Sequence, residues 1–236
     1  KLLIDLQKQK FKIIQTHKNN TGVIFVKEKK IYKKFSFNKE GANKIKDEAR
    51  GIKWYQKKLK YSFNLLQKAK YSKDFAFINT KKIEGKKIKS WKKLSYTFPY
   101  LLKAFNHYKT IFKKKKLTNI HGDLTLDNIF FSKKGVIFFD WEFFGSRKKF
   151  YGFDIAYLFL SAICLPVASG KKITKEDELY FEKLWKLLIL EKINFQIIKD
   201  PFNFFSNTIK NDKVLKKSYK ISKKKFFPFL ISNKDK

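Results

Sequence analysis

Residues 119–142 (NIHGDLTLDNIFFSKKGVIFFDWE) constrain the fold of this chain more than any other segment. A polar stretch is followed by a strongly apolar one, with Gly135 inside it. A loop followed by β-prone residues around a glycine turn predicts a β-hairpin over residues 128–140. The same segment holds Asp123, Asn128 five residues later and Asp140 twelve residues further on.

These three residues are of the types that phosphoryl transfer requires. One carboxylate accepts the proton of an acceptor hydroxyl, while an Asn oxygen and a second carboxylate bind the Mg²⁺ ions that neutralise charge on the transferred phosphate. The spacing matches a catalytic loop of the form H-x-D-x-x-x-x-N followed by a metal-binding Asp. The alternative is a surface turn capped by Asp123, with Asp140 exposed after a strand.

His121-Gly122-Asp123, Asn128 and Asp140-Trp141-Glu142 together resemble the aminoglycoside phosphotransferase and choline kinase branch of the protein-kinase-like fold. The resemblance covers residues 20–160 and is strongest over residues 119–154. It implies ATP and Mg²⁺ as cofactors, Asp123 as the catalytic base and His121 as an organiser of the loop. It also implies Asn128 and Asp140 as metal ligands, and Asp154 as a residue that supports the loop through hydrogen bonds. A plain helix N-terminal carboxylate is the alternative for Asp154.

The pattern along the chain, read with this resemblance, predicts an α+β, bilobal, protein-kinase-like fold. The first lobe, residues 1–84, is expected to bind the nucleotide with a small antiparallel sheet and one key helix. Its strands are predicted at residues 11–17, 23–26, 31–37 and 72–85, and its helix at residues 40–59. The second lobe, residues 85–236, is expected to be mainly helical and to hold the catalytic residues and the acceptor. Helices are predicted at residues 90–116, at the apolar stretch 156–168, and after a capping box formed by Thr174 and Asp177.

The first lobe should supply a strand lysine for the nucleotide phosphates and a helix glutamate that pairs with it. Residues 31–35 offer both Lys33 and Lys34. Because alternate residues of a strand share a face, Lys33 lies with Ile31, Phe35 and Phe37, and we expect this apolar face to point inward. Lys33 is therefore the predicted lysine. Glu48 follows the apolar stripe of the helix and is the predicted partner.

The phosphate-binding loop is expected at Asn20-Thr21-Gly22, which contains a single glycine and no G-x-G-x-x-G pattern. Contact with the phosphates would then depend on a few backbone N–H groups and on polar side chains. The weak loop supports an alternative function, a catalytically impaired pseudokinase-like scaffold. The presence of Asp123, Asn128 and Asp140 opposes that alternative.

The acceptor is expected to be a hydroxyl of a small molecule or saccharide. Protein kinases carry an arginine where this chain has Gly122, and no A-P-E motif follows Asp140. Trp185 and Phe204 could stack on such an acceptor, although core packing is the commoner role for aromatic residues.

The formal net charge is +36, and the 56 basic residues are spread over the whole chain. This distribution indicates a solvated lysine surface, so nucleic acid is not expected as the partner. Binding to nucleic acid or peripheral contact with an anionic membrane stays an alternative. The single cysteine, Cys164, excludes an internal disulfide and favours a cytoplasmic location.

Overall fold

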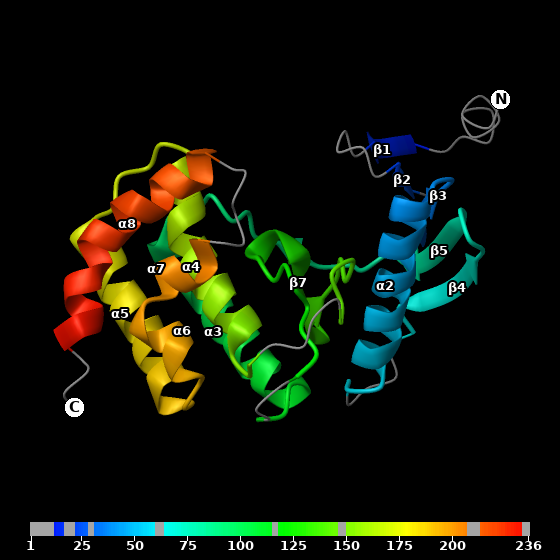
Figure 1. Ribbon diagram of the computed structural model, residues 1–236. Coiled ribbons are helices and arrows are strands. Elements are labelled where there is room, and N and C mark those ends of the chain that lie inside the picture. Colours follow the sequence, from blue (N-terminus) through cyan, green and yellow to red (C-terminus); the bar gives the residue numbers. More distant parts are fainter. Residues whose placement is uncertain are drawn as a thin grey trace. The chain divides into compact units, whose positions relative to one another are not determined.

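The computed structural model describes residues 12–16, 22–27, 31–59, 64–114, 118–145, 150–206 and 213–232. The chain divides into two compact units. Unit 1 is Lys1–Glu84 with Asp140–Arg147, and unit 2 is Gly85–Phe139 with Lys148–Lys236. Antiparallel strands and helices occur in both (Figure 1). The α+β class predicted from the sequence is confirmed.

Unit 1 contains an antiparallel sheet with the strand order β1-β2-β3-β5-β4. Its strands are β1 (Lys12–Thr16), β2 (Ile24–Lys27), β3 (Ile31–Ser36), β4 (Leu66–Tyr71) and β5 (Ala76–Lys81). The first three strands match the predicted ones, and β5 lies within the predicted strand at residues 72–85. The sequence did not predict β4, whose residues LQKAKY lack the usual run of β-branched side chains.

Helix α2 (Lys39–Gln56) packs on β3, β5 and β4. Its first turn is capped by Asn38, whose side chain accepts a 2.8 Å hydrogen bond from the backbone N–H of Gly41. Apolar residues at helical spacing form its buried face: Ala42, Ile45, Ala49, Ile52 and Tyr55. Glu48 lies in the same buried face, as the sequence predicts.

The strand register places Lys34, and not Lys33, on the face that α2 covers. In the pairing of β3 with β5, Lys34 is opposite Ile78, which is fully buried, whereas Lys33 is opposite Asn79. The prediction of Lys33 was wrong because both faces of β3 carry apolar residues. The aromatic side chains on the face of Lys33 contact one another away from α2, and Phe37 among them remains 55% exposed.

The segment that follows the hairpin in sequence belongs to unit 1. Trp141 is fully buried there, with its ring centroid 5.0 Å from that of Tyr55 and 5.9 Å from that of Trp54. The ring centroid of Phe144 lies 5.4 Å from that of Trp54 and 5.8 Å from that of Trp141, so the three rings contact one another. These contacts fix Asp140, the neighbour of Trp141 in sequence, at the same helix that carries Glu48.

Unit 2 is built around helix α4 (Phe153–Ala168), which is buried on almost every side and packs against α3, α5, α7 and α8. The surrounding helices are α3 (Leu94–Ile111), α5 (Lys175–Leu190), α6 (Phe195–Lys199), α7 (Pro201–Ser206) and α8 (Lys213–Ser232). The predicted capping box at Thr174 and Asp177 is present at the start of α5. None of the helices in the described part of the chain has the length and apolar character needed to span a bilayer.

A three-stranded sheet completes unit 2, with β7 (Ile129–Ser132) between β6 (Lys86–Lys87) and β8 (Gly135–Phe138). Strands β7 and β8 form the predicted hairpin, with Ser132 opposite Gly135 at its turn. A short 3₁₀ turn at Leu126–Asn128 leads directly into β7. The polar loop that begins at residue 119 therefore ends at the first strand of the hairpin.

Candidate functional site

Unit 1 holds a partly buried ionic cluster formed by Lys34, Glu48 and Asp140. The Lys34 ammonium lies 2.7 Å from Glu48 Oε2 and 2.6 Å from Asp140 Oδ1, and its side chain is 11% exposed. The three residues come from β3, from α2 and from the segment after β8. The partner predicted for the strand lysine, Glu48, is thus present, but it binds Lys34.

The charges of this cluster are strongly coupled. Burial acts to lower the pKa of Lys34, but Asp140 and Glu48 outweigh it and hold the pKa above its usual range. Burial raises the pKa of Glu48 to about 7, with Lys34 opposing and Asp140 adding to the rise. Lys34 is therefore a permanent cation that shares its charge between two carboxylates.

Asp140 has a backbone conformation that non-glycine residues seldom adopt, with φ of 66°. Aspartate tolerates this left-handed region better than most residues, but the conformation still has a cost. Such strain persists where the surrounding contacts impose it, and these positions cluster at functional sites. Here the burial of Trp141 and the bond to Lys34 supply those contacts.

In unit 2, Asp154 organises the loop at residues 121–123. Its carboxylate, fully buried in the first turn of α4, accepts hydrogen bonds from the backbone N–H groups of His121 at 2.8 Å and Gly122 at 2.9 Å. Gly122 has φ of 91°, which favours glycine at this position. The supporting contacts that the resemblance implied for Asp154 are confirmed.

His121 is fully buried and links the loop to the end of β8. Its Nε2 is 2.8 Å from the carbonyl oxygen of Phe139, and its Nδ1 is 3.4 Å from the backbone N–H of Asp123. A neutral imidazole that donates from Nε2 and accepts at Nδ1 satisfies both contacts. His121 therefore orients the loop.

Asn128 binds Asp123 through its amide nitrogen. Nδ2 donates to the backbone oxygen of Asp123 at 2.8 Å and to its carboxylate Oδ2 at 3.1 Å. Among the described contacts both bonds use the nitrogen, which leaves the amide oxygen of Asn128 for another partner. Carboxylate and amide oxygens are the ligands that Mg²⁺ prefers, so Asp140 in unit 1 and Asn128 in unit 2 each offer donors that fit this ion.

The described residues contain no group of three or more His, Cys, Asp or Glu side chains that could hold a metal ion. This is compatible with Mg²⁺, which commonly uses one or two carboxylates together with water and substrate phosphates. An all-protein metal cage would need a larger set of ligands.

The predicted phosphate-binding loop is only partly described. Asn20 and Thr21 lie outside the described residues, whereas Gly22 has φ of 62°. A Cβ at Gly22 would collide with Nδ2 of Asn38, the residue that caps α2. Gly22 thus lets the chain pass close to the start of α2.

Two features near the loop were not predicted from the sequence. The hydroxyl oxygen of Ser90 accepts a 3.2 Å hydrogen bond from the backbone N–H of Asp127, and the Asp127 carboxylate accepts one from the backbone N–H of Ser90, also at 3.2 Å. Tyr157, one turn after Asp154 in α4, has its pKa raised first by burial and then by the charge of Asp123. In the sequence, the three-residue spacing between Asp154 and Tyr157 indicates only that the two side chains share a helix face.

Trp185 and Phe204, considered above as stacking residues, have core contacts. Trp185 is buried and stacks on Phe181 at 5.3 Å. Phe204 contacts Phe205 at 5.1 Å and Phe153 at 6.2 Å.

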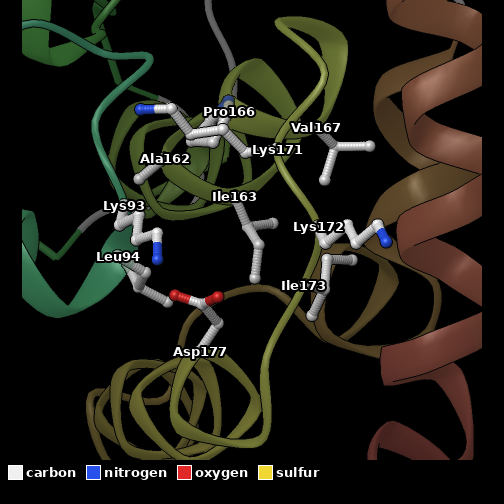
Figure 2. A pocket seen from close by; sticks show the side chains of 10 residues that line it. All are labelled: Lys93, Leu94, Ala162, Ile163, Pro166, Val167, Lys171, Lys172, Ile173 and Asp177. Atoms are coloured by element: carbon white, nitrogen blue, oxygen red, sulfur yellow. The ribbon is translucent and has the colours of Figure 1, made fainter.

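A small pocket with room for about one water molecule lies in unit 2, beside the second half of α4 (Figure 2). Figure 2 shows the side chains of Lys93 and Asp177 turned toward one another at its edge. Asp177 already caps α5, and Lys171 donates to the backbone oxygen of Trp91 at 2.6 Å. Ala162, the first residue of α4 that lines this pocket, follows Asp154 by eight residues, which is about 12 Å along the helix at about 1.5 Å per residue. It is thus separate from the loop at residues 121–128.

Comparison of the sequence with protein-family models and with curated proteins gives no significant match.

Proposed function

We propose that this protein is an ATP- and Mg²⁺-dependent phosphotransferase that acts on a hydroxyl of a small molecule or saccharide. The observation that carries the proposal is the bridging of Glu48 and Asp140 by Lys34. A buried cation between two carboxylates is weak as a source of stability. It suits a site that must bind phosphate oxygens with a fixed positive charge and a metal ion with an adjacent carboxylate.

In this proposal unit 1 supplies the nucleotide contacts. The Lys34 ammonium binds phosphate oxygens, and Glu48 keeps the lysine side chain in place. Asp140 is one ligand for Mg²⁺, which would neutralise negative charge on the phosphate during transfer. Unit 2 supplies Asn128 as a second ligand and Asp123 as the base.

Asp123 is suited to accept a proton because its surroundings hold its carboxylate in one orientation. The bond from Asn128 engages one carboxylate oxygen, and Asp154 and His121 fix the backbone on its N-terminal side. When the acceptor hydroxyl attacks the γ-phosphorus, its oxygen forms the new P–O bond and its proton passes to the Asp123 carboxylate. The bond between the γ-phosphorus and the bridging oxygen breaks, and ADP leaves.

Tyr157 supports a hydroxyl acceptor near Asp123. A tyrosine phenol is protonated at neutral pH and can donate a hydrogen bond to such an acceptor. The glycine at position 122, in place of an arginine, favours an acceptor other than a protein. The use of ATP fits a cytoplasmic location.

The test is a phosphorylation screen of a metabolite pool with Mg²⁺ and ATP labelled at the γ-phosphate. Label should appear in a small molecule with the wild-type protein. Asp123→Asn should reduce the rate by about 10²- to 10⁴-fold, because a general base contributes about that much. Asp74→Asn, a matched change at an exposed aspartate, should retain full activity. Wild-type turnover by Asp123→Asn would contradict the assigned base, and transfer to no acceptor would contradict the proposed reaction.

A further inference from the structure

The turn between α5 and α6, residues 191–194, is flanked by unusually exposed apolar side chains. Leu190 is 76% exposed and Phe195 is 65% exposed, the highest values among the large apolar side chains of the described residues. Ile189 next to them is also exposed. Isolated exposed apolar residues are ordinary, but a close group of large ones marks an interaction surface.

The turn is firmly attached to the rest of unit 2. Glu191 accepts a 3.1 Å hydrogen bond from the hydroxyl of Tyr151 and a 2.8 Å ion pair from Lys114. Ile193 is buried against Gly152, where an added Cβ would lie 2.5 Å from the Ile193 side chain. The exposed residues Leu190 and Phe195 therefore extend from an anchored base.

Lysines surround this turn. Lys109 and Lys114 lie 4.0 and 2.8 Å from Glu191, and Lys113 is the exposed neighbour of Lys114 in sequence. Lys192 is exposed within the turn itself. Glu191 is the one acidic residue of the turn, and its carboxylate is already engaged by Tyr151, Lys109 and Lys114.

Lys192 also occupies a backbone position that normally favours glycine. Its φ is 55°, and its N–H bonds to the carbonyl of Ile189 at 2.9 Å to end helix α5. Glycine or asparagine is usual at such a helix end, and other residues have a cost of about 1 kcal/mol. A lysine in this position places a charge beside Leu190.

We propose that the surface formed by residues 189–195 with Lys109, Lys113 and Lys114 binds an anionic membrane. Leucine and phenylalanine side chains enter the boundary between headgroups and acyl chains, while surrounding lysines are attracted to anionic headgroups. Nucleic acid would satisfy the lysines but would leave Leu190 and Ile189 without apolar partners. Lysine is depleted from the centre of protein–protein interfaces, so a membrane fits the combination best. The proposal does not depend on the phosphotransferase reaction.

The first test is co-sedimentation of the full chain with phosphatidylcholine vesicles that contain about one third phosphatidylserine. Leu190→Ser and Phe195→Ser should each weaken binding by about tenfold, since burial of one such side chain contributes about that much. Leu179→Ser is the matched control, because Leu179 is 58% exposed on the same helix but lies among Glu176, Glu178 and Glu182. Binding should be unchanged in this variant.

The charge contribution is tested with Lys192→Glu against Lys70→Glu, an equal change at an exposed lysine of β4. Only Lys192→Glu should weaken binding strongly, and vesicles of phosphatidylcholine alone should bind little. Equal losses in the two variants would show that total charge alone causes adsorption. The proposal would also be overturned if RNA competed with the vesicles and bound the Leu190→Ser and Phe195→Ser variants as tightly as wild type.

Insertion can be observed directly because Cys164 is the single cysteine of the sequence and is buried. Phe195→Cys can therefore be labelled selectively with an environment-sensitive fluorophore, with labelled Leu179→Cys as the control. On addition of the anionic vesicles the label at position 195 should shift to shorter wavelength and be quenched by spin-labelled lipid. A label that stays in water at position 195 would exclude insertion, whether or not the protein sediments with the vesicles.

Discussion

The Lys34 ammonium balances the negative charges of two carboxylates, so its removal should affect both stability and nucleotide binding. In Lys34→Ala, Glu48 and Asp140 lose their shared cation, and loss of one member of a buried ionic group typically destabilises by about 3 kcal/mol. We expect a loss of that size in urea unfolding, together with loss of Mg-ATP binding in calorimetry. Lys33→Ala, the neighbouring control on the other face, should change stability by less than about 1 kcal/mol. The opposite pattern would contradict the observed strand register.

The raised pKa of Asp154 predicts how activity and stability depend on pH. Burial raises its pKa to about 6, and the hydrogen bonds from Gly122 and His121 oppose this only in part. Because only the ionised carboxylate can accept both bonds, activity should fall as the pH drops through about 6. The free energy of unfolding changes in the other direction, because the Asp154 carboxyl binds its proton more tightly in the folded state than in the unfolded state. The stabilisation from this proton is fully present below the ordinary pKa of aspartate and is lost as the pH rises through about 6.

The measurement is the initial rate of phosphoryl transfer at saturating substrates over a range of pH. Glu48 also has a raised pKa, about 7, so the Glu48→Gln variant separates the two groups. The fall in rate near pH 6 should remain in this variant. Its disappearance would assign the pH dependence to Glu48.

At the level of helices and strands, Gly51 decides how closely α2 approaches the segment that carries Asp140. A Cβ at this position would lie 2.5 Å from Cβ of Trp141 and 2.8 Å from Cβ of Phe144. Alanine favours a helix by about 1 kcal/mol over glycine. Both contacted atoms are attached to the backbone, however, and overpacking costs about 1–3 kcal/mol.

Gly51→Ala should therefore destabilise the protein and lower its activity by displacing Asp140. Urea unfolding and the transfer rate measure the two effects. Lys53→Ala, at an exposed position of the same helix, should change stability by about 0.5 kcal/mol or less. A Gly51→Ala variant that is more stable than wild type would show that the Trp141 segment can move away freely.

The elements with strong local signals were predictable from the sequence. Helix α2 has an apolar stripe and a capping residue, and the hairpin β7–β8 has apolar strands around Gly135, so both were predicted within a few residues. Strand β4 was missed because polar and lysine residues dominate it, and its pairing with β5 is a tertiary contact.

The site residues show the same limit. The spacing of Asp123, Asn128 and Asp140 was visible locally, and so was Glu48 in the stripe of α2. The choice between Lys33 and Lys34 required knowledge of which face of β3 is covered, and both faces carry apolar side chains. The role of Ser90 depends on a contact with Asp127, 37 positions away in sequence, which no local pattern indicates.

For the whole molecule, the proposed function predicts that nucleotide binding stabilises the fold only when Mg²⁺ is present. A ligand at about 100 times its dissociation constant adds about 2.7 kcal/mol to the free energy of unfolding. For a chain of this size that corresponds to an increase in the melting temperature of about 5–10 °C. Thermal unfolding of the full chain with ATP, in Mg²⁺ and in a chelator, measures the difference.

Variants of the two units should respond differently in this experiment. Asp140→Asn weakens a metal ligand of unit 1, so most of the Mg-ATP stabilisation should be lost. Asp123→Asn removes the base but no proposed metal ligand, so this variant should be stabilised nearly as much as wild type while transferring little phosphate. Asp74→Asn should match wild type in both respects. If Mg-ATP stabilises Asp140→Asn as much as wild type, Asp140 is not a metal ligand. If ATP raises the melting temperature equally in Mg²⁺ and in chelator, ATP binds without the metal that the proposed reaction requires.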